Sequence, residues 1–161
     1  MKKNILTRFK NNIETIDISK KKIDYRINLL EFTNLTSLNC SNNKIELLDG
    51  QLPDTLMDLN CSKNLIKNLD YLPSRLRILV CHHNLLTNLD NLPGGLFKLD
   101  CGFNQLVRLD NLPCCLEYLF CNNNQILSLN NLPHMLKYLY CHNNNVKIEL
   151  KNLPDLEKII S

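Results

Sequence analysis

The chain contains no alanine and no tryptophan, and it has only four glycines among its 161 residues. Alanine is the strongest helix former, so its absence disfavours an ordinary helical bundle. No apolar run approaches the roughly 18 residues that a membrane-spanning helix needs. Neither sign of charge dominates, since 19 Lys and Arg accompany 16 Asp and Glu. The residues in excess are leucine, with 34 copies, and asparagine, with 25.

Six of the eight cysteines recur at intervals of 20 residues, apart from one interval of 21. Each lies in a pattern of the form Leu-x-x-Leu-x-Cys-x-x-Asn-x-(Ile/Leu/Val), followed by a Leu-Pro pair, and these pairs hold all six prolines. A fixed period of this length indicates stacked structural repeats rather than a disulfide framework. The recurring cysteines are Cys40, Cys61, Cys81, Cys101, Cys121 and Cys141.

Each repeat is expected to form one short strand, two turns and an extended return, because 20 residues leave no room for a long helix. Apolar and variable residues alternate around each recurring cysteine, which is typical of a strand. The strands then stack in parallel into a sheet of about eight short strands. The sequence predicts three parts: an N-terminal cap with a degenerate first repeat (1–34), six full repeats (35–155) and a terminal partial repeat (156–161).

The recurring Leu, Cys and Asn side chains are expected to face the interior. The cysteine column is interpreted as compact buried thiols, because we find neither a base beside a nucleophile nor a set of converging metal ligands. No catalytic, cofactor-binding or metal-binding residue is therefore predicted. Cys114 and Cys115 do not belong to this column. They follow a Leu-Pro pair and are expected near the edge of the return, where exposed thiols can oxidise or bridge chains.

The pattern resembles the leucine-rich repeat, and the likeness covers about residues 13–161. The Leu-Pro return at a 20-residue period is similar to the short repeats of secreted bacterial effectors, including the recognition domains of effector ubiquitin ligases. The Asn-, Ile- and Lys-rich composition also resembles leucine-rich repeat proteins of giant viruses. The resemblance implies a solenoid, mostly β, shaped as a horseshoe with a concave parallel sheet and little helix, which binds proteins and is not an enzyme.

Strand residues between the buried positions are expected to point to the concave side. This face changes in character along the chain, from small polar residues in the first repeats to aromatic residues in the last. Aromatic residues dominate binding hot spots, whereas cross-strand stacking that merely stabilises the sheet is the alternative. The predicted partner-binding residues are Ile78, Val80, Lys98, Asp100, Phe103, Tyr118, Phe120, Tyr138, Tyr140 and His142.

The expected partner is a protein of unknown identity, bound mainly by the C-terminal aromatic end. Two alternatives stay open: a substrate-recognition subunit acting with a separate ubiquitin ligase, and nucleic-acid binding through the basic N-terminal arm. The second is disfavoured, because no aromatic residue interleaves with Lys20, Lys21 and Lys22. No membrane contact is predicted, and the chain is expected to be a monomer or a weak edge-to-edge dimer. Eight thiols favour a reducing, intracellular compartment, with host cytoplasm as one location.

Overall fold

The computed structural model describes residues 6, 12–24, 26–48, 50, 52–145 and 155–160. Each repeat contributes one strand of three residues, and the degenerate copies at both ends also form strands. The expected number of about eight strands is therefore confirmed. The strands are β1 (Thr15–Asp17), β2 (Ser37–Asn39), β3 (Asp58–Asn60), β4 (Ile78–Val80), β5 (Lys98–Asp100), β6 (Tyr118–Phe120), β7 (Tyr138–Tyr140) and β8 (Lys158–Ile160).

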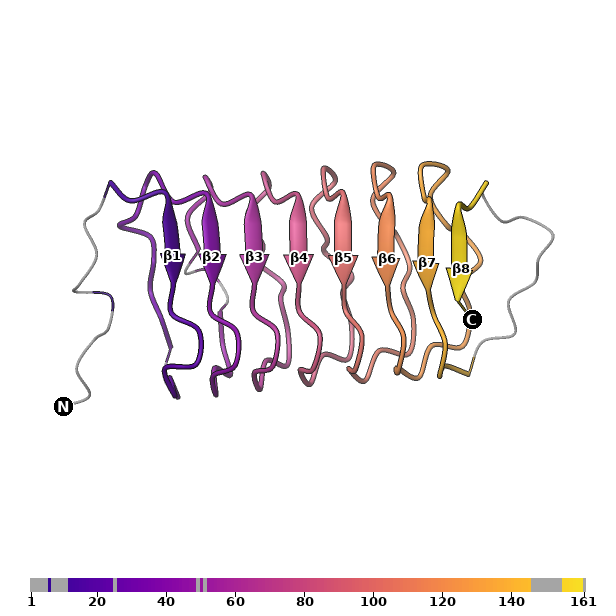
Figure 1. Cartoon of the computed structure of the whole chain (residues 1–161), viewed down its shortest axis with the longest axis horizontal. Helices are drawn as coiled ribbons and strands as arrows, with labels where there is room; N and C mark the ends of the chain where they lie inside the picture. Colours follow the sequence, from indigo (N-terminus) through magenta and orange to yellow (C-terminus); the bar gives the residue numbers. More distant parts are fainter. Residues whose placement is uncertain are drawn as a thin grey trace.

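All eight strands form one parallel sheet in which the spatial order equals the sequence order. The strands lie side by side along the long axis of the molecule, with the return segments behind them (Figure 1). The register follows the repeat, so that Leu99 of β5 pairs with Leu119 of β6 and Leu119 pairs with Leu139 of β7. Equivalent side chains of successive repeats consequently form columns along the solenoid.

The core is built from these columns. The central leucine of each strand from β2 to β7 is buried, and its two neighbours are half-buried. All six recurring cysteines are buried beside the leucines as free thiols. Burying one leucine side chain contributes about 1.5–3 kcal/mol, so the regular spacing of leucine accounts for a continuous core without any return helix.

The recurring asparagines link each turn to the preceding one. The Asn64 amide group donates to the backbone oxygens of Cys61 (3.0 Å) in its own repeat and Cys40 (3.1 Å) in the preceding repeat. Its Oδ1 accepts from the backbone N–H of Ile45 at 3.0 Å. Asparagine thus serves its own turn and the preceding repeat, because its amide offers two N–H donors and an acceptor oxygen together.

Two turns flank each strand. The turn before β6 is closed by a backbone bond from Leu116 N–H to the Pro113 carbonyl at 3.0 Å. Pro113 stands at the start of this turn, where its missing N–H costs no hydrogen bond. The turn after the strand has one residue with φ near +55° in each full repeat. These left-handed residues are Asn42, Lys63, His83, Phe103, Asn123 and Asn143.

Candidate functional site

One face of the sheet is formed by the first and third side chains of each strand, which point away from the leucine core. We call this the outward sheet face; it is the face that the sequence predicts to be concave. From β2 to β7 its residues are half-buried, which leaves part of each side chain open to solvent. The face therefore offers a regular array of side chains whose spacing is set by strand pairing.

Four rings form a compact group at the C-terminal end of the outward sheet face. Tyr118 stacks on Tyr138 with 4.8 Å between ring centroids and an interplanar angle of 2°, and Phe120 stacks on Tyr140 at 4.8 Å and 24°. We call these four residues the aromatic cluster. The cross-strand stacking that the sequence analysis held as an alternative is present in the structure, and each ring remains half-buried rather than buried.

Two lysines flank the aromatic cluster. The Lys98 ammonium lies 5.6 Å from the ring centroid of Phe120, and that of Lys158 lies 5.4 Å from the centroid of Tyr140. A cation over an aromatic face is held by the ring quadrupole. The Tyr138 hydroxyl donates to Glu157, and this hydrogen bond raises the pKa of Tyr138 above its usual value. The cluster thus presents apolar ring surface with a positive charge on either side.

The predicted residues of β4 and β5 extend this surface toward the middle of the sheet. Ile78 and Val80 are half-buried on the outward face of β4. Asp100 faces the same way on β5, and its Oδ1 accepts from the backbone N–H of Gly102 at 3.3 Å. The structure therefore brings Ile78, Val80, Lys98 and Asp100 onto one face with the aromatic cluster.

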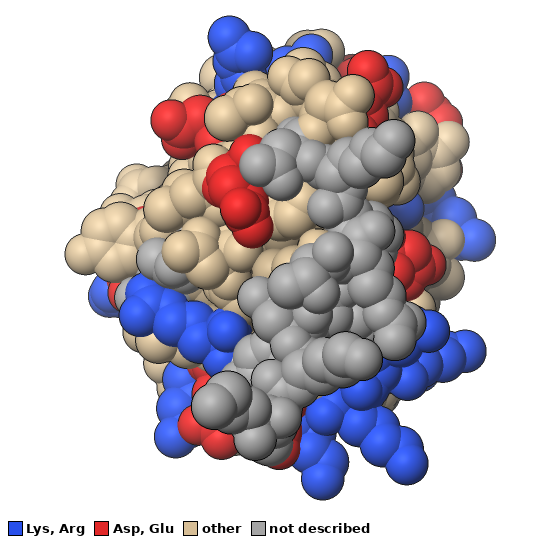
Figure 2. All heavy atoms as spheres, turned by 90° about the vertical axis from the view of Figure 1, so that its left-hand side faces the viewer, with Lys and Arg blue, Asp and Glu red and all other residues tan. Residues whose placement is uncertain are grey.

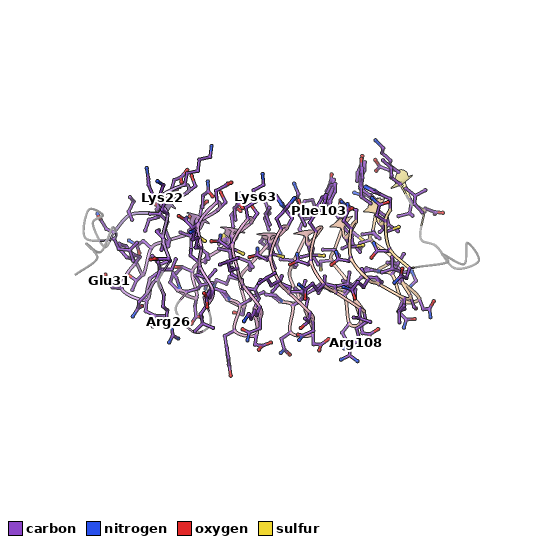
Figure 3. The ribbon with its side chains drawn as sticks, turned by 90° about the horizontal axis from the view of Figure 1, so that it is seen from below. Lys22, Arg26, Glu31, Lys63, Phe103 and Arg108 are labelled. Atoms are coloured by element: carbon purple, nitrogen blue, oxygen red, sulfur yellow. The ribbon has the colours of Figure 1, made fainter. Side chains whose placement is uncertain are left out.

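Phe103 lies in the turn after β5 and not in the strand. Its ring stacks on the His83 ring with 4.1 Å between centroids and is exposed. Figure 3 shows Phe103 on the same side of the ribbon as Lys22 and Lys63, and opposite Arg108. Phe103 thus forms part of the rim of the outward sheet face, together with His83, which the sequence analysis did not select.

The position after each cysteine contributes less to the surface than expected. Ser41, Ser62 and Gly102 are buried there, and His142 is half-buried with its Nδ1 atom enclosed and without a hydrogen-bond partner. Packing between neighbouring repeats is the cause: a Cβ on Gly102 would approach Asn122 Oδ1 to 3.1 Å and its backbone oxygen to 3.2 Å. His142 is therefore a peripheral member of the predicted site.

The sequence analysis missed Lys158 and Ile160 of β8. Their register with Tyr138 and Tyr140 places them on the outward sheet face beside the aromatic cluster. The 20-residue offset from β7 predicts both positions, because it holds through the terminal partial repeat. The offset alone could have identified both residues. They were missed because the terminal partial repeat lacks the cysteine and the asparagine that mark the six full repeats.

The cysteine column does not form a reactive site. Burial raises the pKa of the Cys61 thiol to about 12 and that of Cys141 to about 11. A thiol held in its neutral form is a poor nucleophile and a poor metal ligand. These values agree with the interpretation of the column as packing.

Basic side chains surround the N-terminal end of the molecule. Lys20, Lys21 and Lys22 are exposed there. Figure 2 shows Lys and Arg around the rim of this end, with Asp and Glu between them. Residues 1–5 and 7–11, which hold most of the predicted N-terminal arm, lie outside the described residues. Within the described part of the chain, no helix has the length and apolar character needed to cross a bilayer.

Solved structures that match this arrangement include three bacterial proteins. The functional domain of InlJ from Listeria monocytogenes, which includes a cysteine ladder, matches with a TM-score of 0.82 and 32% identity over 92% of this chain and 34% of that one. A Shigella effector leucine-rich repeat domain matches with a TM-score of 0.68 and 26% identity, over 85% and 72%. YopM from Yersinia enterocolitica matches with a TM-score of 0.62 and 32% identity, over 80% and 33%.

The repeat, the eight-stranded parallel sheet and these neighbours make the chain a leucine-rich repeat solenoid. Within that class it is similar to internalins and bacterial effectors, which confirms the resemblance to effector repeats. The chain spans about a third of the InlJ and YopM chains. No protein-family model matches the sequence, and a search of characterised proteins finds no match. Leucine-rich repeat solenoids of this kind are typically interaction scaffolds rather than enzymes.

Proposed function

We propose that this chain is a non-enzymatic interaction module that docks a partner protein on its outward sheet face, mainly at the C-terminal aromatic end. The observation that supports this most is the aromatic cluster: four half-buried rings from two adjacent strands, on the face opposite the core. Tyrosine and other aromatic residues supply large contact areas at low cost in side-chain entropy, and they are enriched at binding hot spots.

Stacking within the cluster is compatible with binding. Two pairs of rings held at 4.8 Å are already ordered before a partner arrives, so less conformational entropy is lost on association. Ile160 adjoins Tyr140 at the C-terminal end, whereas Ile78 and Val80 of β4 are separated from the rings by Lys98 and Asp100 of β5. A partner that covers β4 to β8 would meet apolar side chains on β4, β6 and β7, with charged side chains on β5 and β8 between and beside them.

The charges of this surface favour a partner with apolar residues and carboxylates. Lys98 and Lys158 lie beside the rings, where a carboxylate of the partner would find an ammonium group next to an apolar contact. Asp58 lies on β3, further toward the N-terminal end of the face, and Asp100 lies on β5 in register with Phe120, so a basic group of the partner would be expected near either carboxylate. Charge complementarity of this kind sets the orientation of a bound protein more than its affinity.

The test is the double substitution Tyr138→Asp with Tyr140→Asp. We expect binding of a partner recovered from the native cell, and then purified, to weaken at least about 100-fold by calorimetry, because two hot-spot contacts are replaced by desolvated carboxylates. A second variant, Tyr138→Ser with Tyr140→Ser, removes the rings without adding charge.

The matched control is Ser37→Asp with Asn39→Asp, which places the same charges at the equivalent positions of β2. Circular dichroism and thermal melts establish that all variants remain folded. Equal affinity of the wild type and both tyrosine variants would overturn the proposed site. A loss shared by the β2 control would instead indicate a general effect of charge.

A further inference from the structure

The turns that follow the strands line one edge of the solenoid and contain no acidic residue. Each turn consists of the four residues after the buried cysteine or, in the first repeat, after Ile18. The seven turns after β1 to β7 hold five lysines and three of the four histidines, but none of the 16 Asp and Glu. We call this surface the turn edge; its segments are 19–22, 41–44, 62–65, 82–85, 102–105, 122–125 and 142–145.

Backbone hydrogen bonds stack these turns into one continuous column. In the middle of the column, the Lys63 N–H donates to the His82 carbonyl at 2.8 Å. Equivalent bonds join the other turns, from Lys20 in the first to Asn123 in the sixth. Because strands of a sheet lie about 4.8 Å apart, each turn presents its side chains one short step beyond those of the preceding turn.

Positive charge is concentrated at the N-terminal end of the turn edge. Its five lysines are exposed and lie in the first three turns: Lys20, Lys21, Lys22, Lys44 and Lys63. Within two residues of these turns, Lys67 adds one positive charge, and Asp17, Asp24 and Glu46 add three negative ones. Six lysines against three carboxylates leave a net charge of +3. Such an edge attracts an extended polyanion.

A stacked ring pair adjoins the last of these lysines. The rings of His83 and Phe103 lie 4.1 Å apart at an interplanar angle of 19°, and Phe103 is 46% exposed. Partial burial lowers the pKa of His83, and the charges of His82 and Lys63 add to this effect. Asp100 acts in the opposite direction without reversing it. At pH 7 His83 is therefore neutral, and the pair presents planar rings beside the Lys63 ammonium.

Lysines in line with an exposed ring pair favour one class of polyanion. Proteins that bind single-stranded nucleic acid combine a basic track for the phosphates with aromatic side chains on which bases stack. An acidic peptide or a lipid headgroup would contact the lysines, but neither has a planar face to stack on the rings. A duplex keeps its bases paired in its interior. An unpaired strand thus uses both features of the turn edge.

We propose that the turn edge binds single-stranded nucleic acid, with phosphates at the lysines of the first three turns and a base stacked on the His83–Phe103 pair. The sequence places no aromatic residue among the lysines at 20–22, but a later repeat supplies one, because stacking brings equivalent turns into line. Figure 3 shows Lys22, Lys63 and Phe103 one after another along the same side of the ribbon. This site is separate from the aromatic cluster and goes beyond the proposed function.

The experiment is fluorescence anisotropy of the full chain with a fluorescein-labelled oligouridine of about 12 nucleotides, at a series of salt concentrations. Lys20→Ser with Lys21→Ser and Lys22→Ser should lower the affinity at least about tenfold at low salt. It should also reduce the slope of log affinity against log salt by about 2, since each phosphate contact on a single strand contributes about 0.7. Phe103→Asn should lower the affinity at least about fivefold and leave the slope unchanged, because a stacking contact is lost without any change of charge.

The matched control is Arg75→Ser with Arg77→Ser and Arg108→Ser, which removes three positive charges outside the turn edge. We expect it to retain most of the affinity and the full salt slope. Equal losses in the two triple variants would overturn the proposal, as would undetectable binding by the wild type. Equally tight binding of an RNA duplex or of polyglutamate would also overturn it, because neither offers an unpaired base.

A further variant separates this proposal from the proposed function. Tyr138→Ser with Tyr140→Ser changes the aromatic cluster and leaves the turn edge intact, so we expect normal binding of the oligouridine. Loss of binding in this variant would place the strand on the outward sheet face and would overturn the assignment to the turn edge. Circular dichroism of each variant establishes that it remains folded.

Discussion

A single asparagine in each full repeat connects two neighbouring turns of the solenoid. The Asn104 amide group donates to the carbonyls of Cys101 (3.0 Å) and Cys81 (3.1 Å), and its Oδ1 accepts from Leu86 N–H at 3.1 Å. Buried backbone groups that lose a partner cost more than the hydrogen bond itself contributes. A short polar side chain at this position thus stabilises backbone from two repeats.

Replacing this side chain should be costly. We expect Asn104→Ala to lower the free energy of unfolding by about 1–3 kcal/mol, since it leaves backbone groups of two repeats without partners. Urea unfolding followed by circular dichroism measures the change. Gln105→Ala is the control, because Gln105 is exposed and its substitution should change stability by less than about 0.5 kcal/mol. Equal losses in the two variants would contradict this role for Asn104.

At the scale of the element, the turn after each strand uses a left-handed residue in every full repeat. Asparagine tolerates this conformation well and occupies it in the second, sixth and seventh strand repeats, at Asn42, Asn123 and Asn143. Phe103 adopts it with φ +54° and His83 with φ +54°. Such a conformation costs an ordinary residue roughly 1–2 kcal/mol, so phenylalanine is unfavourable for the backbone at position 103. A contact made by the exposed ring at the rim of the proposed binding face would offset this cost.

The strain can be measured by comparing two substitutions that both remove the ring. We expect Phe103→Asn to be more stable than Phe103→Ala by about 1 kcal/mol, because both lose the stacking on His83 and only asparagine suits the left-handed backbone. Thermal and urea unfolding of the two variants, side by side, gives the difference. A more stable alanine variant would show that the backbone relaxes when the ring is removed.

At the scale of the whole molecule, stability is a sum of contacts between neighbouring repeats. Each strand of the sheet pairs only with the strands before and after it, so among the described strands no pairing joins the two ends of the solenoid. Solenoids of this kind can open from their ends. The last strand, β8, is exposed along its length, whereas the central strands are covered on both sides by neighbours.

The reaction rates of the buried cysteines measure this opening, because a buried thiol reacts only when its repeat opens. With N-ethylmaleimide and peptide mass spectrometry, we expect Cys114 and Cys115 to react at once in the native protein. Among the column, Cys141 should react first and Cys81 and Cys101 last, since Cys141 lies under the exposed terminal strand. Equal rates for all six column cysteines would instead indicate that the chain unfolds as one unit.

Much of the fold and part of the site could be predicted from the repeat alone. The buried leucines and cysteines, the strand positions of Tyr118 and Tyr140, and the asparagine bonds all follow from the shared period. The reduced exposure at Ser41, Gly102 and His142 did not, because it depends on how closely neighbouring turns approach. The stacking of Phe103 on His83 likewise depends on backbone conformation at a turn.

The sequence by itself determined which side chains form columns, because six copies of one pattern allow a single register in a parallel sheet. Only the tertiary structure decided how members of a column meet. Ring planes stack, lysines lie over rings, and two sulfurs come within 3.8 Å of each other according to rotamers and turn geometry. The sequence repeat does not determine these side-chain arrangements, because side-chain torsions depend on the neighbours that each residue contacts.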